Sequence, residues 1–196
     1  NIGVTAGLEN TAPKPEWVEG MNRMDMNIVV SKFVKGVFND VVFDRVDEKS
    51  KKKIGEVRIT KPMEVLFEGA DGEIYKKIKE YSDEFVGEMD KIPEKWCYLY
   101  VGHWLQGNLG QDRKDTGMML KTFLETFKNN PRAPALIMKT SGATFSIIDR
   151  NEMLGKIEKI KNGTTGRLPN VYLLHGDMSD DGMNELYPHP KVQDMV

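Results

Sequence analysis

The sequence has little cysteine and no long apolar run. Cys97 is the single cysteine among 196 residues. One cysteine excludes an internal disulfide and is typical of a reducing compartment. No apolar stretch approaches the roughly 20 residues that a transmembrane helix needs. The sequence therefore predicts a cytoplasmic protein without a membrane span.

A strong excess of charge is also absent. The net charge is −2, with 30% charged and 39% hydrophobic residues, and the mean hydropathy is −0.49. This balance is typical of a soluble globular protein. Because there is no basic excess, the composition does not predict a nucleic-acid partner, and any anion site must be local.

The common motifs for metals and nucleotides are missing. No CxxC or HxxxH spacing occurs, so the sequence predicts no metal site. No GxGxxG or Walker-type glycine pattern occurs either, so the usual dinucleotide and nucleoside-triphosphate motifs are not supported. We therefore expect no cofactor.

The first third of the chain alternates strand and helix patterns. Ile2–Thr5 and Met26–Val30 are short apolar runs that predict buried strands. A helix is expected over Glu16–Arg23, and a second over Lys32–Phe38 with Ser31 as its N-cap and Phe33, Val34, Val37 and Phe38 on one face. Strand–helix–strand–helix in about forty residues predicts a parallel sheet.

The middle of the chain is more polar. The charged run Asp44–Lys53 is expected to be a solvated loop, and Val57–Ile59 and Met63–Phe67 to be short strands. Ile74–Met89 has apolar residues at spacings of four, three, four and four, which predicts a helix.

From Trp96 onward the pattern predicts half of a doubly wound sheet. Strands are expected at the start of this region and at Ala133–Lys139, Val171–Leu174 and Lys191–Val196. The second of the intervening helices is expected to be capped by Asp149, with Glu152 as its capping-box partner, and the third by Ser179.

This order predicts an α/β protein of two Rossmann-like pieces with parallel sheets. Residues 1–72 would form one piece, 73–95 a helical connection and 96–196 the other. Because the chain begins and stops within strand patterns, we expect both sheets to be incomplete and the sequence to be a fragment of a longer protein.

A candidate phosphate site lies between the strand that starts at Cys97 and the helix that follows it. Gly102 and His103 end the strand, and Arg113 and Lys114 precede the helix. A phosphate there could contact the Arg113 fork, the Lys114 ammonium and the helix N–H groups beyond Asp115. Alternatively, both cations are solvated and neutralised by neighbouring aspartates.

Other polar residues follow predicted strands. His175 and Gly176 end one strand and Lys139 ends another, so all three would face the same edge of the sheet. Lys139 would either reach an anion there or extend into solvent. His189, between two prolines, is expected at the surface.

In the first piece, Thr5, Gly7 and Glu9 follow a predicted strand. If the two pieces face each other, these residues would lie on the opposite wall of the cleft. Glu9 could act as an acid or base there, although a loop carboxylate is more often simply solvated.

Four segments together resemble a glycosyltransferase of the two-Rossmann-domain (GT-B) class, close to family 4. They are MDMNIVVSKFVKGVF, MEVLFEGAD, YLYVGHW…DRKDTGMMLKTF and VYLLHGDMSDDGMNELY. The first resembles the end of the acceptor domain, and the second the turn before the crossover. The third resembles the donor-phosphate element, and the fourth the segment beside the nucleotide base.

The resemblance implies retaining transfer from a nucleotide sugar to an unknown acceptor. No metal is expected to be required, since the sequence shows no carboxylate pair suited to one. The resemblance puts Gly102, His103, Arg113 and Lys114 at the donor diphosphate, and His175, Gly176 and Met178 beside the base. It puts Thr5, Gly7 and Glu9 on the acceptor side. The catalytic residue stays unassigned.

The sequence also departs from the family pattern. His103 stands where an arginine is common, and Asp115 where a glycine is usual. The expected Glu-x7-Glu element would lie beyond Val196, so the fragment would lack part of the donor site.

Two other functions remain open. The chain could be a non-catalytic α/β binding or assembly module, in which a homodimer covers exposed strand edges. It could also be another sugar-phosphate enzyme on the same fold, such as an epimerase.

Overall fold

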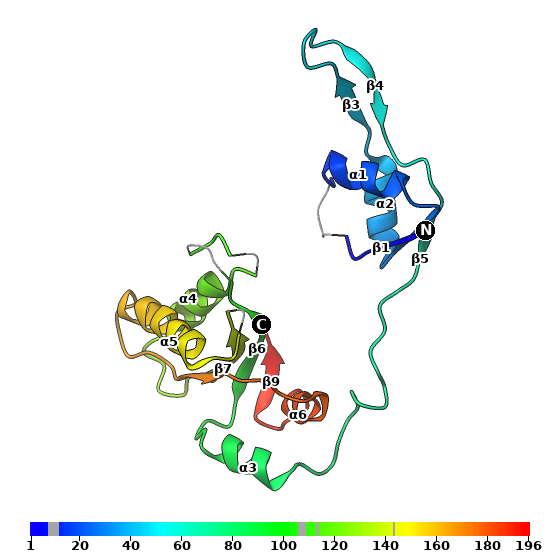
Figure 1. Cartoon of the computed structure of the whole chain (residues 1–196). Helices are drawn as coiled ribbons and strands as arrows, with labels where there is room; N and C mark the ends of the chain where they lie inside the picture. Colours follow the sequence, from blue (N-terminus) through cyan, green and yellow to red (C-terminus); the bar gives the residue numbers. More distant parts are fainter. Residues whose placement is uncertain (8–11, 106–108, 113, 143) are drawn as a thin grey trace. The chain divides into compact units, whose positions relative to one another are not determined.

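The computed structural model describes residues 1–7, 12–105, 109–112, 114–142 and 144–196. These residues form an α/β protein with two parallel sheets, and the chain divides into two compact units, Asn1–Ala70 and Asp71–Val196 (Figure 1). The predicted fold class, with two Rossmann-like pieces and parallel sheets, is confirmed. No helix in the described part of the chain is long and apolar enough to cross a membrane.

The first unit is built on a parallel sheet of three strands. Its order is β1 (Ile2–Thr5), β2 (Met26–Val29) and β5 (Met63–Val65). Helix α1 (Pro15–Asn22) connects β1 to β2, and helix α2 (Lys32–Asp40) follows β2. Both connections move in the same direction across the sheet, so both helices cover the same face.

The core of the first unit lies under these two helices. It is formed by Val18, Met21, Val29, Val34, Phe38, Val57 and Met63. The predicted cap of α2 is confirmed, since the Ser31 hydroxyl accepts a hydrogen bond from Val34 N at 3.1 Å. The prediction that Phe33 shares the buried face with Val34 and Phe38 is wrong, because its side chain is 57% exposed.

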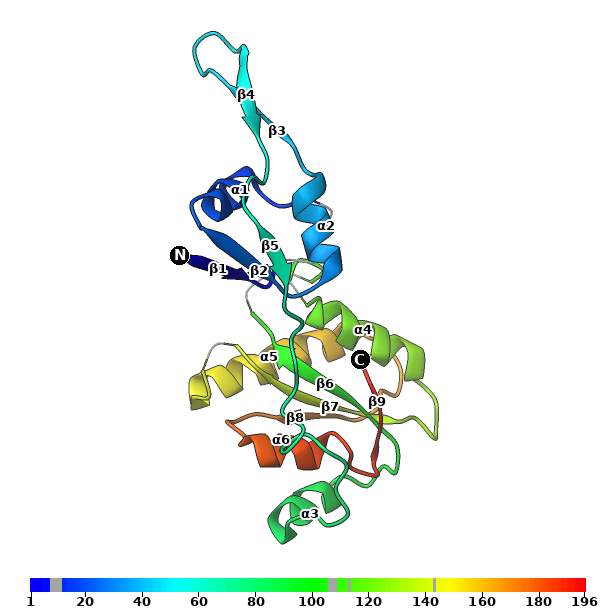
Figure 2. The same ribbon diagram turned by 90° about the vertical axis from the view of Figure 1, so that its right-hand side faces the viewer.

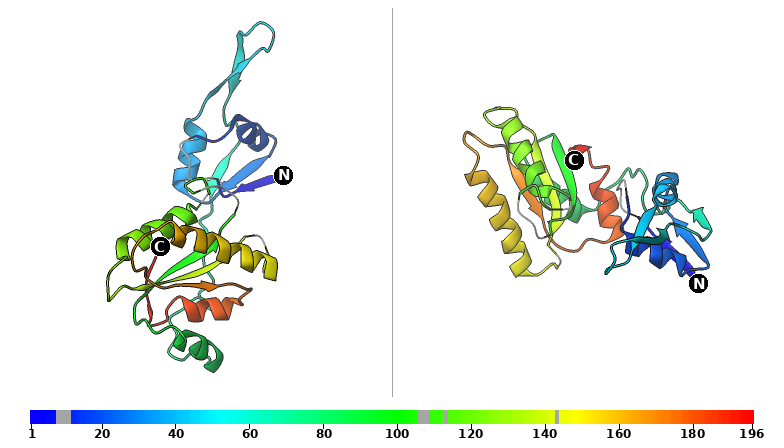
Figure 3. Two further views of the ribbon diagram at one scale, coloured as in Figure 1. Left: turned by 90° about the vertical axis from the view of Figure 1, so that its left-hand side faces the viewer. Right: turned by 90° about the horizontal axis from the view of Figure 1, so that it is seen from above.

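The prediction of a solvated loop over Asp44–Lys53 is right for Asp47–Lys52 and wrong at both ends, which belong to the strands of a β-hairpin. Strand β3 (Phe43–Val46) pairs antiparallel with β4 (Lys53–Val57). Only Asp47–Lys52 lies between the strands, and the hairpin extends away from the α1–α2 body of its unit (Figure 3, left).

The second unit contains a parallel sheet of four strands in the order β8-β7-β6-β9. The strands are β6 (Cys97–His103), β7 (Ala135–Ser141), β8 (Val171–Leu174) and β9 (Val192–Met195). In chain order this is 3-2-1-4, which is four strands of the doubly wound order. The predicted strand Val171–Leu174 is confirmed to the residue.

Helices cover both faces of this sheet (Figure 2). Helices α4 (Thr116–Phe127) and α5 (Ile147–Asn162) pack on one face, over a core that includes Tyr100, Leu136 and Met138. Helices α3 (Asp83–Asp90) and α6 (Asp180–Leu186) pack on the other face, with Leu99 and Ile137. Ser179 caps α6 as predicted, because its hydroxyl accepts from Gly182 N at 3.1 Å.

Two helix predictions for this unit are wrong. The helix expected over Ile74–Met89 forms only as α3, which starts at Asp83 behind the N-cap Ser82. The N-cap of α5 is Ser146 rather than Asp149, since the Ser146 hydroxyl accepts from Asp149 N at 3.1 Å.

Candidate functional site

The strand order of the second unit reverses between β6 and β9. The helices that follow β6 and β7 lie on one face of the sheet, whereas α6, which precedes β9, lies on the other. Met195 of β9 pairs with Leu99 of β6. In open α/β sheets, ligands bind beyond the carboxyl ends of the strands at such a reversal, so a ligand is expected beside the segment that follows His103.

The Lys114 side chain lies over Gly102 at the end of β6. A Cβ atom on Gly102 would be 2.9 Å from Lys114 Cδ, 3.1 Å from Lys114 Nζ and 2.9 Å from the Tyr100 hydroxyl. That hydroxyl is fixed by a buried hydrogen bond of 2.7 Å to the Thr116 hydroxyl. Because residue 102 is a glycine, the exposed Lys114 side chain can lie directly against the end of the strand.

The start of α4 is partly occupied by the protein itself. The Asp112 carboxylate is buried and accepts a hydrogen bond from Thr116 N at 2.7 Å. Fewer helix N–H groups are therefore free to bind a phosphate than predicted, because the N–H of Thr116, the first residue of α4, already donates to Asp112. Asp115 adopts a left-handed φ of 50°, a conformation that glycine enters without a steric penalty.

Thr140 is a member of this site that the sequence analysis missed. It is the register partner of Gly102 on the neighbouring strand, so the two residues share a face of the sheet. Its side chain is 3% exposed, and its hydroxyl has no hydrogen-bond partner within the described residues. A buried hydroxyl without a partner is unfavourable. Alternate residues of a strand share a face, so the apolar Leu136 and Met138 could have indicated that the Thr140 side chain points to the same face of the sheet.

The His103 side chain lies on the opposite face of the strand from Gly102 and the Lys114 side chain that covers it. Its Nδ1 is 3.2 Å from the hydroxyl of Ser141, its register partner on β7. The imidazole is thereby held at the carboxyl edge of the sheet, next to the α3–α6 side rather than the Lys114 side.

A buried carboxylate joins the loops after β7 and β8. Asp149 accepts hydrogen bonds from Gly142 N at 3.0 and 3.1 Å, and its Oδ2 is 2.8 Å from His175 Nε2. The Asp149 and His175 side chains are 9% and 4% exposed. The predicted base-binding residue His175 is therefore part of an internal polar pair.

Lys139 reaches the same two loops. Its ammonium donates a hydrogen bond to the Gly176 carbonyl and lies 5.2 Å from the centroid of the Phe145 ring. Burial lowers the pKa of Lys139, and the nearby Asp177 carboxylate partly opposes this effect. Lys139 therefore neither extends freely into solvent nor points to an open crevice. The predicted base-binding residue Gly176 accepts a hydrogen bond from it.

Met178 belongs to a different environment. It lines a cavity of about 600 Å³ together with side chains of α3, β8 and α6, such as Phe85, Tyr172 and Leu174. The three residues predicted beside a nucleotide base thus lie in three settings: a buried pair, a lysine-bound carbonyl and an apolar cavity.

In the first unit, Thr5 and Gly7 form a tight turn after β1. The Thr5 hydroxyl accepts a hydrogen bond from Gly7 N at 3.2 Å. Gly7 has a φ of 62°, and a Cβ there would lie 2.5 Å from Val34 Cγ1. Glycine is therefore required at position 7 for packing against α2, whatever else the turn does.

Two predicted site residues, Glu9 and Arg113, lie outside the described residues. Within the described ranges, no group of three histidine, cysteine, aspartate or glutamate side chains is arranged to hold a metal ion. Cys97 is fully buried, and burial raises the pKa of its thiol to about 11.

These features define a Rossmann-like α/β protein with a polar edge at the carboxyl ends of β6, β7 and β8. A scan of protein-family models found no match to the chain, and neither did searches of curated proteins and of solved structures.

Proposed function

We propose that this chain is part of a glycosyltransferase that uses a nucleotide-sugar donor. The observation that carries the proposal is the Lys114 ammonium beside Gly102, with the buried Thr140 hydroxyl on the next strand. A cation and an unpaired hydroxyl at the carboxyl end of the first strand suit a diphosphate oxygen.

The role of Lys114 in this proposal is electrostatic. In the transfer, the bond between the anomeric carbon and the diphosphate oxygen breaks, and the diphosphate keeps the electron pair. An ammonium beside the leaving group stabilises the negative charge that develops on it. The oxygen of an acceptor hydroxyl forms the new bond to the anomeric carbon with retention, as the family resemblance implies, and its proton passes to the departing diphosphate. The acceptor stays unspecified.

A thermal-shift series with UDP, GDP, ADP and their sugars tests this proposal. A donor present at about 100 times its Kd should stabilise the protein by about 2.7 kcal/mol. Lys114→Ala should abolish the shift, whereas Lys95→Ala, an exposed lysine just before the amino end of β6, should keep it. The proposal is wrong if none of the nucleotides stabilises the protein, or if both variants behave alike.

The second candidate is a non-catalytic binding or self-assembling module. It is favoured by the uncovered face of the first sheet, where Ile2 is 63% exposed and Val4 is 73% exposed. Parallel sheets are normally covered on both faces. Sedimentation over a range of concentrations tests it: a dimer that Val4→Ser weakens supports this function, and a monomer at every concentration excludes self-assembly.

A further inference from the structure

The tip of the β3–β4 hairpin carries a local excess of positive charge. The turn from Asp47 to Lys53 contains four lysines and two carboxylates, and all four lysines are exposed. The turn is ordered by its own hydrogen bonds, from Asp47 N to Lys52 O at 3.0 Å and from Lys51 N to Asp47 O at 2.9 Å. The lysines are therefore displayed on a defined loop.

The hairpin carboxylates neutralise mainly one lysine. Lys53 pairs with Asp44 at 2.7 Å and Glu56 at 2.8 Å, and these contacts raise its pKa to about 12. The Asp47 carboxylate accepts from Ser50 N at 2.6 Å. Within the described residues, no ion pair involves the ammonium groups of the other three lysines of the turn, Lys49, Lys51 and Lys52.

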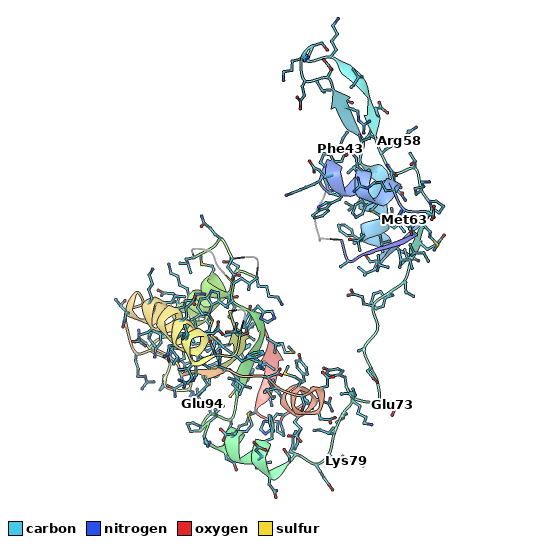
Figure 4. The ribbon with its side chains drawn as sticks, in the orientation of Figure 1. Phe43, Arg58, Met63, Glu73, Lys79 and Glu94 are labelled. Carbon is cyan, nitrogen blue, oxygen red and sulfur yellow. The ribbon has the colours of Figure 1, made fainter. Side chains whose placement is uncertain are left out.

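Aliphatic side chains stand beside these free cations. Ile54 is 62% exposed and Val46 is 47% exposed, and they flank the turn on the two strands. Among the described residues, the hairpin is anchored near its base by Val57 in the core, by Phe43 packed against that core, and by Arg45, which pairs with Glu19 at 2.6 Å. Figure 4 labels Phe43 and Arg58 at this base, where Arg45 meets Glu19 of α1, and the tip beyond it extends away from the helices of its unit.

We propose that this hairpin tip binds the surface of a membrane that contains anionic lipids. Lys49, Lys51 and Lys52 would contact the headgroup phosphates, while Val46 and Ile54 would enter the boundary between headgroups and acyl chains. The projection of the hairpin beyond the body of its unit lets the tip reach a flat surface. This binding does not depend on the proposed transferase activity.

The same charges fit a nucleic acid less well. The turn has no aromatic side chain on which a base could stack, and the arginine on its strand β3, Arg45, is paired with Glu19. Exposed Ile54 and Val46 gain nothing from a phosphate backbone, whereas a bilayer boundary removes them from water. A lipid surface uses both features of the tip.

The experiment is flotation of the whole chain with lipid vesicles. The probes are phosphatidylcholine alone and phosphatidylcholine with about 30 mol % phosphatidylglycerol, at about 0.1 M salt. The test variant is Lys49→Gln/Lys51→Gln/Lys52→Gln. The matched control is Lys76→Gln/Lys77→Gln/Lys79→Gln, which removes three exposed lysines from the second unit.

We expect binding to the anionic vesicles only, and a loss at about 0.5 M salt because the attraction is screened. The tip variant should bind on the order of 100-fold more weakly, since each lysine near such a surface contributes about fivefold. The control should bind as the native chain does. Melting curves should be the same for all three proteins, because the substituted side chains are exposed.

Four outcomes would overturn the proposal. The native chain could fail to bind anionic vesicles, the tip variant could bind as well as the native chain, or the control could lose as much affinity as the tip variant. In the fourth, a double-stranded oligonucleotide would bind through the tip lysines while vesicles do not, which would make the hairpin a nucleic-acid element.

Discussion

Replacing Gly102 by alanine should remove the Lys114 position and destabilise the second unit. The new Cβ would lie 2.9 Å from both Lys114 Cδ and the Tyr100 hydroxyl, which is below the usual contact distance. The lysine can move aside, but Tyr100 is buried and bonded to Thr116. Forcing one carbon into such a site costs about 1–3 kcal/mol.

Gly155→Ala is the matched control for this change. Gly155 lies inside α5, and a Cβ there would meet nothing within 4 Å. The same substitution should therefore stabilise the unit by about 0.5–1 kcal/mol, because alanine is the better helix former. The free energy of unfolding should therefore fall in Gly102→Ala and rise in Gly155→Ala. The two variants should differ from each other by about 1.5–4 kcal/mol.

Amide hydrogen exchange read by mass spectrometry suits this comparison, since the chain has two units and one melting curve would mix them. Peptides from β6 and α4 should exchange faster in Gly102→Ala and slower in Gly155→Ala. Gly102→Ala should also lose the thermal shift from nucleotide sugars. If it exchanges like the native protein and keeps that shift, the packing of Lys114 over Gly102 is irrelevant to the site.

Three further predictions concern buried groups of the second unit. Asp149→Ala should destabilise it by about 3 kcal/mol, because Gly142 N and His175 lose a charged partner; faster exchange in β7 would show this, and unchanged exchange would contradict it. Burial, and next the positive charge of Lys191, lower the pKa of His189 from 6.5 in the folded state. The unfolded state therefore binds more protons at acidic pH, and stability should fall as the pH drops from 7.5 to 5.5. Denaturation at the two pH values should show this fall, and His189→Gln should reduce it; an equal slope in both proteins would refute the assignment. Cys97 should react with a thiol reagent only after unfolding, since it is buried with a raised pKa; rapid labelling of the native chain would disagree.

Much of the strand and cap pattern could be predicted because its signals are local. Ile2–Thr5 and Val171–Leu174 are apolar runs closed by turn residues, and both strands form at the predicted bounds. Ser31 and Ser179 precede helices and cap them as expected. In each case a few adjacent residues determine the structure, and the tertiary contacts are compatible with that local preference.

The helix prediction over Ile74–Met89 failed because tertiary bonds replaced helical ones. Lys76 N donates to the Asn184 side chain, and the Tyr81 hydroxyl donates to the Pro188 carbonyl. Ser82 bonds to Glu185 through both its backbone N–H and its hydroxyl. These partners lie about 100 residues away, and the periodicity of the segment carries no record of them.

The candidate site shows the same division. The sequence indicated Lys114 and Gly102 because a glycine and a cation flank a strand–helix junction. It did not indicate Asp112 as the group that occupies the helix start, nor Thr140, whose role depends on strand register. His189, expected at the surface, is 9% exposed and lies against the rings of Tyr81 and Phe85.

The position of β9 in the sheet has a consequence for the synthesis of the chain. β6 pairs on one side with β7, which follows closely, and on the other side with β9, whose Val192 is the register partner of Cys97 about 95 residues earlier. A ribosome must therefore make α4, β7, α5, β8 and α6 before that edge of β6 can be covered. Pairing across so long a stretch is slow, and domains assemble as the chain emerges. We expect the nascent protein to hold an open strand edge on β6 until the residues of β9 have left the ribosome.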